Sequence, residues 1–332
     1  MVQRIIIIHG RSTKPAKRKY ADLLKMALLQ GLKRVNPQKE ELVREGIVSV
    51  DFVYYGDINN RILAEKSSTV RRKLTDFDPD LDNAPCLSDS GYANAIDAMS
   101  SFRNFDRREY NSVVRQNSDK RWRDDIARLT STISAITTAT LLNEKVIKFA
   151  TADLGAYLMR RTIGSMIRER LHTPLKNALT GGDDVCLIAH SMGAIVSYDV
   201  LWKFSRMSEY KDVQEAANPV SLWLTLGSPL GEAGVRANLY DADERTHAHE
   251  TDKHPKDIVR IWHNIAAHDD FISHDPTMKD DFRDMLRFKL LEDIKDHRVY
   301  NCWAFRGDAN PHKFYGYLVN PKTSAMIADW IR

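Results

Sequence analysis

The stretch VCLIAHSMGAIVSYDVL, residues Val185–Leu201, changes from one kind of secondary structure to another within a few residues. Its first part is an apolar run that ends at Ala189, and its last part has apolar residues at helical spacing. Between them lies the short segment HSMG, which contains Ser191. A buried strand that turns directly into a helix is typical of α/β proteins, so the stretch predicts an α/β fold with Ser191 at the turn.

The N-terminal part of the chain has the same pattern. The run QRIIIIHGRST, residues 3–13, predicts a buried strand closed by a tight loop. Tyr20–Val35 has helical spacing, and Ile47–Ile58 is strongly β in composition. Strand, helix and strand in this order form a βαβ unit, so we expect a parallel sheet that is buried on both faces.

The alternation of predicted strands and helices returns after Gly182, and we expect an open, mostly parallel central sheet flanked by helices. The core of this sheet is predicted to comprise residues 1–60 and 178–332. Further strands are predicted at Asp184–His190, Ser221–Pro229, Asp257–Ala266 and Arg298–Phe305, with a final helix at Ala325–Ile331.

Residues 61–177 form a large insertion between the early strands and the Ser191 strand. From about Arg61 to Asn177 the chain has no convincing strand, and Leu81–Tyr92 has the composition of a loop. Leu129–Asn143 is uncharged and rich in threonine and alanine, but it is too short and polar to span a bilayer. An ordinary core helix, a lid, a membrane-touching helix and a partner-binding region all stay open for this insertion.

The composition of the chain argues against several other classes of protein. The chain of 332 residues is 43% hydrophobic and has no long apolar run, so we expect a globular protein without an export signal. Its three cysteines, Cys86, Cys186 and Cys302, lack the spacing of a disulfide framework or zinc site, which favours a cytoplasmic location. The net charge of +4 is too small to indicate a nucleic-acid partner.

A basic cluster follows the first strand directly. Charge runs usually face water, which favours a solvated helix start, although a guide for an anionic substrate stays open. The cluster consists of Arg11, Lys14, Lys17, Arg18 and Lys19.

The segment AHSMG, between a strand and a helix, resembles the nucleophile elbow of α/β-hydrolases, in particular of lipases and esterases in which alanine replaces the first glycine. The resemblance implies that Ser191 is a catalytic nucleophile, with the Met192 N–H as an oxyanion donor. A serine hydroxyl is a weak nucleophile and needs a base, an acid and such donors. The alternative is that Ser191 only caps the following helix.

Other parts of the chain resemble the remaining pieces of such a site. IIIIHG is similar to the strand and His-Gly loop that supplies a second oxyanion donor, here Gly10 or Arg11. The pattern W-x-N, a turn and Asp-x-Ile is similar to the acid loop of lipase-like members, which implies Asp270 as the acid. Asp269 stays an alternative, Asp275 lies in the same loop, and Asp241 and Asp243 are weaker candidates.

In this superfamily the base comes last, after the final strand, and His312 is the histidine in that place. His297 is expected to precede the strand and to lie at the opposite edge; if His312 is not the base, His274 and His297 are next. His9 and His190 flank the proposed site and are candidate pocket residues, although packing roles are open.

Two further motifs carry no catalytic prediction. TLGSPL is similar to a pocket-shaping loop of lipase-like hydrolases, and Ser228 in it is assigned no catalytic role. The polar segment with His247, His249 and His254 lacks the rigid setting that metal ligands need, so no metal site is expected.

The resemblance implies a serine hydrolase that cleaves a small-molecule or lipid ester through an acyl-enzyme and needs no cofactor. Thioester and amide substrates stay open because the same triad serves all acyl transfer. The insertion could add a peripheral membrane contact. The alternative function is a catalytically weak or inactive binding module whose insertion recruits a protein partner.

Overall fold

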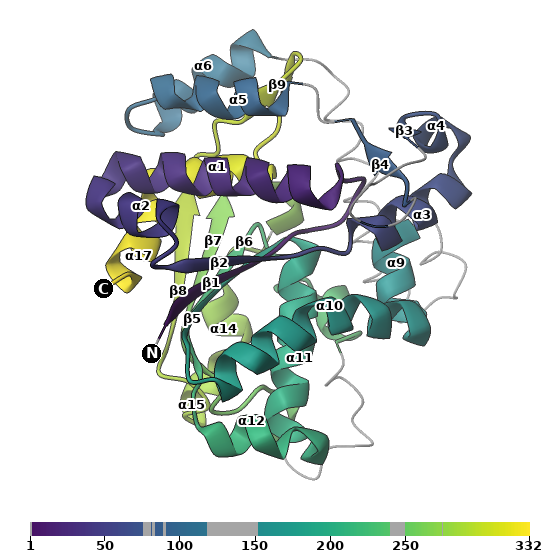
Figure 1. Cartoon of the computed structure of the whole chain (residues 1–332), viewed down its shortest axis with the longest axis vertical. Helices are drawn as coiled ribbons and strands as arrows, with labels where there is room; N and C mark the ends of the chain where they lie inside the picture. Colours follow the sequence, from purple (N-terminus) through teal and green to yellow (C-terminus); the bar gives the residue numbers. More distant parts are fainter. Residues whose placement is uncertain are drawn as a thin grey trace.

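Six parallel strands form the central sheet (Figure 1). The computed structural model describes residues 2–75, 81, 84–88, 91–117, 152–239, 250–273 and 275–332. Every neighbouring pair of strands in this sheet is parallel. The strands in spatial order are β2 (Ser49–Val53), β1 (Gln3–Ile8), β5 (Asp184–His190), β6 (Val220–Leu226), β7 (Val259–Ala267) and β8 (Asp293–Val299).

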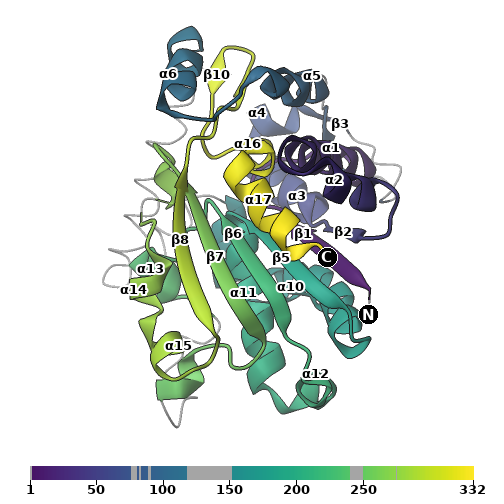
Figure 2. The same cartoon turned by 90° about the vertical axis from the view of Figure 1, so that its left-hand side faces the viewer.

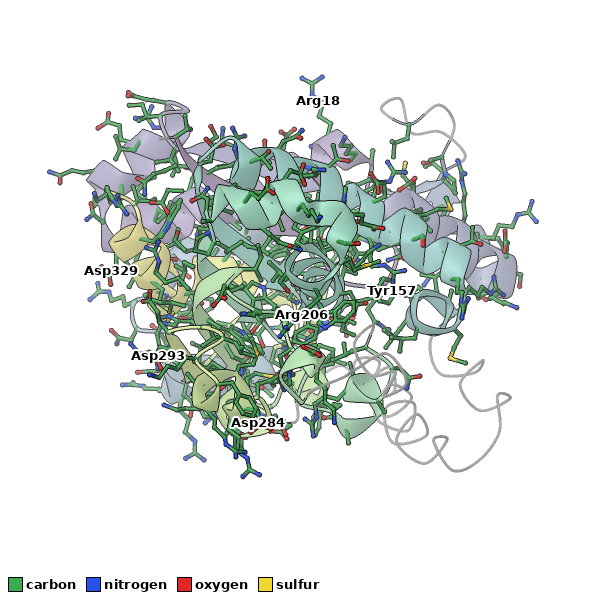
Figure 3. The ribbon with its side chains drawn as sticks, turned by 90° about the horizontal axis from the view of Figure 1, so that it is seen from below. Arg18, Tyr157, Arg206, Asp284, Asp293 and Asp329 are labelled. Carbon is green, nitrogen blue, oxygen red and sulfur yellow. The ribbon has the colours of Figure 1, made fainter. Side chains whose placement is uncertain are left out.

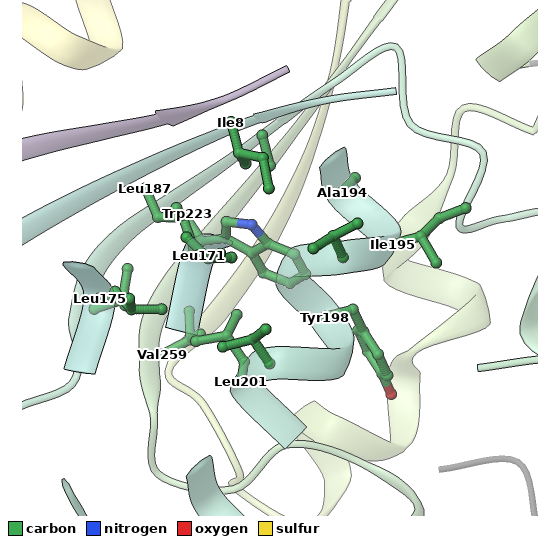
Figure 4. Close-up of a cluster of buried hydrophobic side chains, with 14 of the residues drawn as sticks. Ile8, Leu171, Leu175, Leu187, Ala194, Ile195, Tyr198, Leu201, Trp223 and Val259 are labelled. Carbon is green, nitrogen blue, oxygen red and sulfur yellow. The ribbon is translucent and has the colours of Figure 1, made fainter. Parts of the chain in front are cut away.

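Helices cover both faces of the sheet, as the sequence predicted (Figure 2). Side chains alternate between the two faces along β1, so that Ile6 and Ile8 belong to one buried cluster while Ile5 and Ile7 belong to the other. The first cluster includes side chains of two helices and Trp223 (Figure 4). These helices are α10 (Arg161–Thr180) and α11 (Met192–Arg206); the opposite face carries α1 (Lys17–Val35), α16 (Phe314–Val319) and α17 (Pro321–Trp330).

The predicted helix Tyr20–Val35 is contained in α1. The apolar residues at helical spacing on one face, Leu23, Leu24, Ala27, Leu28 and Leu32, are buried against the sheet, which explains why periodicity found the helix. The helix ends at Asn36, whose side chain accepts a hydrogen bond from the Lys39 amide and so begins a second helix, α2, with Pro37 at its first position.

Shorter elements complete the described chain. The further helices are α2 (Pro37–Arg44), α3 (Gly56–Lys66), α4 (Ser68–Arg71), α5 (Tyr92–Ala98), α6 (Arg107–Gln116), α9 (Ala152–Met159), α12 (Lys211–Ala216), α13 (Ala233–Arg236), α14 (Met278–Asp281) and α15 (Arg283–Arg287). Short 3-10 helices lie at Met99–Ser101, Ser208–Tyr210, Glu250–Lys253 and Phe271–Ser273. The strand pairs β3 (Leu74–Thr75) with β4 (Cys86–Leu87), and β9 (Ala304–Phe305) with β10 (Asp308–Ala309), are antiparallel.

Two predicted strands had wrong boundaries. The β-rich segment Ile47–Ile58 ends as a strand at Val53, and α3 begins at Gly56; the apolar composition continues because Ile58 is buried in the first turn of that helix. The last strand of the sheet is Asp293–Val299 rather than Arg298–Phe305. It lies at the edge of the sheet, where charged side chains are common, and Asp293 lies toward the outside of the molecule (Figure 3).

The insertion is only partly described. The pair β3 and β4 lies inside it, although no strand was expected there. Helix α10 runs across residue 178, and Ile167, Leu171 and Leu175 of this helix pack into the same cluster as the sheet. Leu129–Asn143 lies outside the described residues. No helix in the described part of the chain is both long and apolar enough to cross a bilayer.

The strand order creates a topological switch point between β1 and β5. The connection after β1 carries α1 on one face of the sheet, whereas the connection after β5 carries α11 on the other (Figure 2). Loops that leave two such strands diverge and open a crevice at the carboxyl ends of the strands, where α/β proteins bind ligands. Gly10 follows β1, and Ser191 follows β5, so both lie at the carboxyl edge of the sheet beside this switch point.

Candidate active site

Ser191 lies at a sharp turn between β5, which ends at His190, and α11, which begins at Met192. Its backbone has φ 55° and ψ −124°, a conformation that residues other than glycine rarely adopt. The Ser191 amide donates to Leu226 O at 3.0 Å, and the Ala194 amide donates to Ser191 O at 2.9 Å. Such strained backbone persists where the surrounding structure holds it, commonly at functional sites.

Small residues surround this turn because the backbone of β1 passes close to it. A Cβ on Gly193 would lie 2.6 Å from His9 O, and a Cβ on Gly10 would lie 2.6 Å from Ser191 Cβ. Both distances are shorter than a packed structure allows. Ala189 is fully buried within β5, where its methyl group is accommodated.

The Ser191 side chain belongs to a chain of hydrogen bonds. Its Oγ lies 2.9 Å from His312 Nε2, and His312 Nδ1 lies 2.9 Å from Asp270 Oδ2. A neutral imidazole that donates from Nδ1 keeps Nε2 as an acceptor for the serine proton. Ser191 makes no side-chain hydrogen bond that caps α11, so the cap alternative does not describe this serine.

Asp270 is held as a carboxylate by its surroundings. Burial by itself raises the pKa of Asp270, but the charge and hydrogen bond of His312, the hydroxyl of Tyr317 and the amide of Ile272 together bring the pKa below its ordinary value. The Tyr317 hydroxyl donates to Oδ2 at 2.6 Å, and the Ile272 amide donates to Oδ1 at 3.0 Å. The side chain of Asp270 is fully buried, whereas 18% of the His312 side chain is exposed.

Two residues of the site were missed by the sequence analysis. Tyr317 is one of them, and its fully buried hydroxyl also accepts a hydrogen bond from the Ala267 amide at 2.8 Å. Gly227 is the other: with φ 56°, a Cβ there would lie 2.9 Å from Asp270 Oδ2 and 3.0 Å from His312 Nδ1. The motif TLGSPL contains this glycine, but nothing in the motif alone indicates what faces it.

The loop that carries His312 is fixed at several points. The His312 amide donates to Asn310 Oδ1 at 2.9 Å, and Asn301 Nδ2 donates to Lys313 O at 2.9 Å. His190 Nε2 donates to His312 O at 2.8 Å while its ring stacks on Phe314 with centroids 4.6 Å apart. His190 therefore supports the backbone of His312, a role that sequence reasoning left open beside a pocket role.

His9, which follows β1, has a similar supporting position. It is fully buried, its Nδ1 donates to Gly10 O at 2.7 Å, and its Nε2 accepts from the Tyr55 amide at 3.1 Å. The ring stacks on Tyr55 with centroids 4.0 Å apart. Burial and the charge of Lys14 lower the pKa of His9 well below its ordinary value. A neutral His9 thus ties the Gly10 loop to Tyr55, in the segment between β2 and α3.

The other candidate acids have different surroundings. Burial raises the pKa of Tyr110, and the charge and hydrogen bond of Asp269 raise it further, so Asp269 faces Tyr110. Asp275 Oδ1 accepts from the amide and hydroxyl of Thr277 at 3.1 and 2.9 Å. Asp241 and Asp243 lie outside the described residues. The structure thus brings Asp270, rather than Asp269 or Asp275, together with His312.

The other candidate histidines and serine also have defined places. His297 lies within β8, so the expectation that it precedes the last strand was wrong; its ring faces His263 at 5.0 Å. Ser228 is buried, and its Oγ accepts from the Leu230 amide at 3.2 Å. His254 Nδ1 lies 2.9 Å from the Tyr198 hydroxyl. His247, His249 and His274 lie outside the described residues.

Within the described residues, no group of three or more His, Cys, Asp and Glu side chains is arranged to hold a metal ion. No protein-family model matches the chain, and neither a curated protein nor a solved structure matches it.

Proposed function

We propose that the chain is a serine hydrolase of the α/β-hydrolase type that cleaves a carboxylic ester. The observation that carries the proposal is the hydrogen-bonded chain from Ser191 Oγ through His312 to Asp270, with 2.9 Å at each link. Nucleophile, base and orienting acid in this order are what acyl transfer by serine requires. The order Ser, Asp, His along the chain agrees with the resemblance found in the sequence.

Each group has a role in the proposed reaction. Ser191 Oγ attacks the acyl carbonyl as its proton passes to His312 Nε2, and the same proton then goes to the leaving alcohol. Asp270 keeps Nδ1–H oriented and stabilises the imidazolium. Water, deprotonated by His312, then releases the acid from the acyl-enzyme. The proposed oxyanion donors are the Met192 amide, at the start of α11, and an amide at Gly10 or Arg11.

Hydrolysis of 4-nitrophenyl esters of graded acyl length tests the proposal. Ser191→Ala and His312→Ala should each lower turnover by roughly a millionfold, and Asp270→Asn by on the order of ten-thousandfold. Ser197→Ala is the matched control, since Ser197 is a buried serine on the same helix that bonds Ala194 O. Undiminished hydrolysis by Ser191→Ala would contradict the proposal. A parallel thioester and anilide series shows which acyl bond is preferred.

A further inference from the structure

Three basic residues, Arg11, Lys14 and Lys313, lie on the two segments that carry Gly10 and His312, and one carboxylate, that of Asp153, is found to act on Lys14. Arg11 follows Gly10, where an added Cβ would lie 2.6 Å from Ser191 Cβ. Lys14 lies three residues further along the same loop, and Lys313 follows His312 directly. Arg11 and Lys313 thus adjoin residues of the proposed active site, and Lys14 belongs to the same loop as Arg11.

The ammonium group of Lys14 is held beneath the Gly10 loop. Its Nζ donates to Arg11 O and, at 3.0 Å, to Ser12 O, and the residue is 8% exposed. Its backbone is fixed by Asn60, whose Oδ1 accepts from the Lys14 amide at 2.8 Å and whose Nδ2 donates to Lys14 O at 2.9 Å. Lys14 is therefore a buried basic side chain with a defined place rather than a solvated one.

The ammonium group of Lys313 lies over aromatic rings. Its Nζ is 4.9 Å from the Tyr92 ring and 5.7 Å from the Tyr315 ring. Tyr315 packs edge-on against Tyr20 at 6.1 Å, and Lys14 Nζ lies 5.8 Å from the Tyr20 ring. The two ammonium groups thus border one aromatic surface, which supports cations through its ring faces but does not neutralise them.

One acid, Asp153, offsets part of this positive charge, and both of its oxygens also accept backbone amides. Asp153 attracts Lys14, but its Oδ2 accepts the Ser12 amide at 2.5 Å and its Oδ1 accepts the Leu154 amide at 3.0 Å. In the part of the chain that the structure describes, Arg11 Nη1 is buried without a hydrogen-bond partner. Likewise, no ion pair to Lys313 is found among those residues.

The positive charge of this group reaches His190, the residue that supports the His312 backbone. Burial and His312 lower the pKa of His190, and the charges of Lys14 and Lys313 lower it further. The ring of His190 lies 4.8 Å from that of His312. Carbonyl groups and aromatic rings do not neutralise buried positive charge, whereas an anionic ligand group would compensate it.

We infer that the ester substrate of the Ser191 site carries an anionic group, a carboxylate or a phosphate, which binds beside Arg11, Lys14 and Lys313. This inference rests on the proposed serine hydrolase function and adds the substrate class to it. A carboxylate and a phosphate share the same recognition by lysine and arginine. The anionic group can belong to the acyl part or to the alcohol part of the ester, and these two sources are separated by the choice of probes.

Two matched probe pairs test the inference. For the alcohol side, the pair is 4-acetoxybenzoate, an anion, and 4-acetoxybenzamide, its neutral counterpart. For the acyl side, the pair is the 4-nitrophenyl half-ester of adipate and 4-nitrophenyl 6-oxoheptanoate, in which a methyl ketone replaces the carboxylate. The measured quantity is the ratio of kcat/KM for anionic over neutral ester within each pair, after subtraction of the uncatalysed rate.

For the wild-type protein, kcat/KM is expected to be about tenfold higher for the anionic than for the neutral ester in at least one pair. Lys14→Met and Lys313→Met should each lower that ratio by about threefold or more, and Lys313→Glu should bring it to unity or below. Lys25→Met is the control, because Lys25 is exposed on α1 and its loss changes the net charge equally. It should leave the ratio unchanged, which separates local binding from long-range attraction.

The outcomes distinguish this inference from the function on which it rests. Efficient hydrolysis with ratios of unity in both pairs, or ratios that Lys25→Met lowers as much as Lys313→Met does, would overturn the anionic substrate class while the hydrolase stands. Absence of hydrolysis of all four esters, together with absence of fluorophosphonate labelling, would overturn the hydrolase itself. Circular dichroism of each variant checks the fold, and Lys313→Glu keeps the test decisive if Lys14→Met fails to fold.

Discussion

The Tyr317 hydroxyl donates a 2.6 Å hydrogen bond to Asp270 Oδ2, the same oxygen that faces His312. The hydroxyl is itself fixed by the Ala267 amide at the end of β7. An oxygen that serves two donors is oriented more firmly than one that serves His312 alone, and this bond helps to lower the pKa of Asp270. Tyr317 is thus a positioning residue for the proposed acid.

Tyr317→Phe is expected to lower kcat/KM for esters by about tenfold or more, since a hydrogen bond to a charged group contributes roughly 1.5–3 kcal/mol. The pKa of Asp270 should rise, so the acidic limb of the pH profile should move to higher pH. Stability that a depressed carboxyl pKa supplies is present above the unfolded pKa and is lost as the pH falls. The variant should therefore lose less stability than wild type on acidification, as measured by urea unfolding.

Tyr300→Phe is the control for this prediction, because it removes a tyrosine hydroxyl outside the Ser191–His312–Asp270 chain. It should leave the acidic limb in place. If Tyr317→Phe destabilised the protein but kept the wild-type pH profile, the hydroxyl would have a packing role only.

Gly227→Ala should remove most activity, because its methyl group would meet Asp270 Oδ2, His312 Nδ1 and the Tyr317 hydroxyl at 2.9–3.1 Å. We expect a fall in kcat of about a hundredfold, the size of effect that a displacement of about 1 Å produces. Gly182→Ala is the matched control, since Gly182 also has a positive φ, 76°, but a Cβ there meets nothing within 4 Å. Both variants should lose similar stability, on the order of 1 kcal/mol, from the backbone alone. Equal activities in the two would contradict the site.

His190→Phe separates a supporting role from a pocket role. The stack on Phe314 should survive, whereas the 2.8 Å bond to His312 O is lost. We expect kcat to fall by about threefold to tenfold with little change in KM, because the base becomes less firmly oriented. A higher KM with unchanged kcat would instead show that His190 contacts the substrate.

The preference for an anionic ester should depend on pH. Burial, together with the charges of Lys313 and Arg11 and against that of Asp153, lowers the pKa of Lys14 to about 7, and burial lowers the pKa of Lys313 to about 8. A lysine is cationic below its pKa and neutral above it. The ratio of kcat/KM for anionic over neutral ester should therefore fall as the pH rises from about 6 to about 9. A ratio that stays constant over this range would contradict titration of these lysines.

The sequence indicated that Ser191, Asp270 and His312 come together but did not indicate the residues that hold them, and topology explains the difference. Ser191 and Asp270 each follow a strand of the parallel sheet, so their order along the chain predicts a common edge. His312 follows β8 only after the hairpin of β9 and β10, yet it reaches the same edge. The contacts of Tyr317 and Gly227 depend on how α16 and the β6 loop pack, and no local pattern in the sequence encodes that.

The misplaced boundaries have a similar origin. The edge strand β8, DIKDHRV, carries charged residues on its open side, so apolar composition favoured the segment after it. Tyr54 and Tyr55 are buried beyond the end of β2 because their side chains support the Gly10 loop: Tyr54 bonds Pro15 O at 2.7 Å, and Tyr55 bonds His9 O. Their β-like composition therefore reflects packing at the site rather than strand pairing.

The most direct test of the central claim is the position of a fluorophosphonate adduct, read by mass spectrometry of the labelled protein and its peptides. The proposal predicts one adduct in the wild-type chain, located on Ser191, none on Ser191→Ala, and strongly slowed labelling of His312→Ala. An adduct that persists in Ser191→Ala, or a wild-type chain that the probe leaves unlabelled, would contradict the claim that Ser191 is an activated nucleophile.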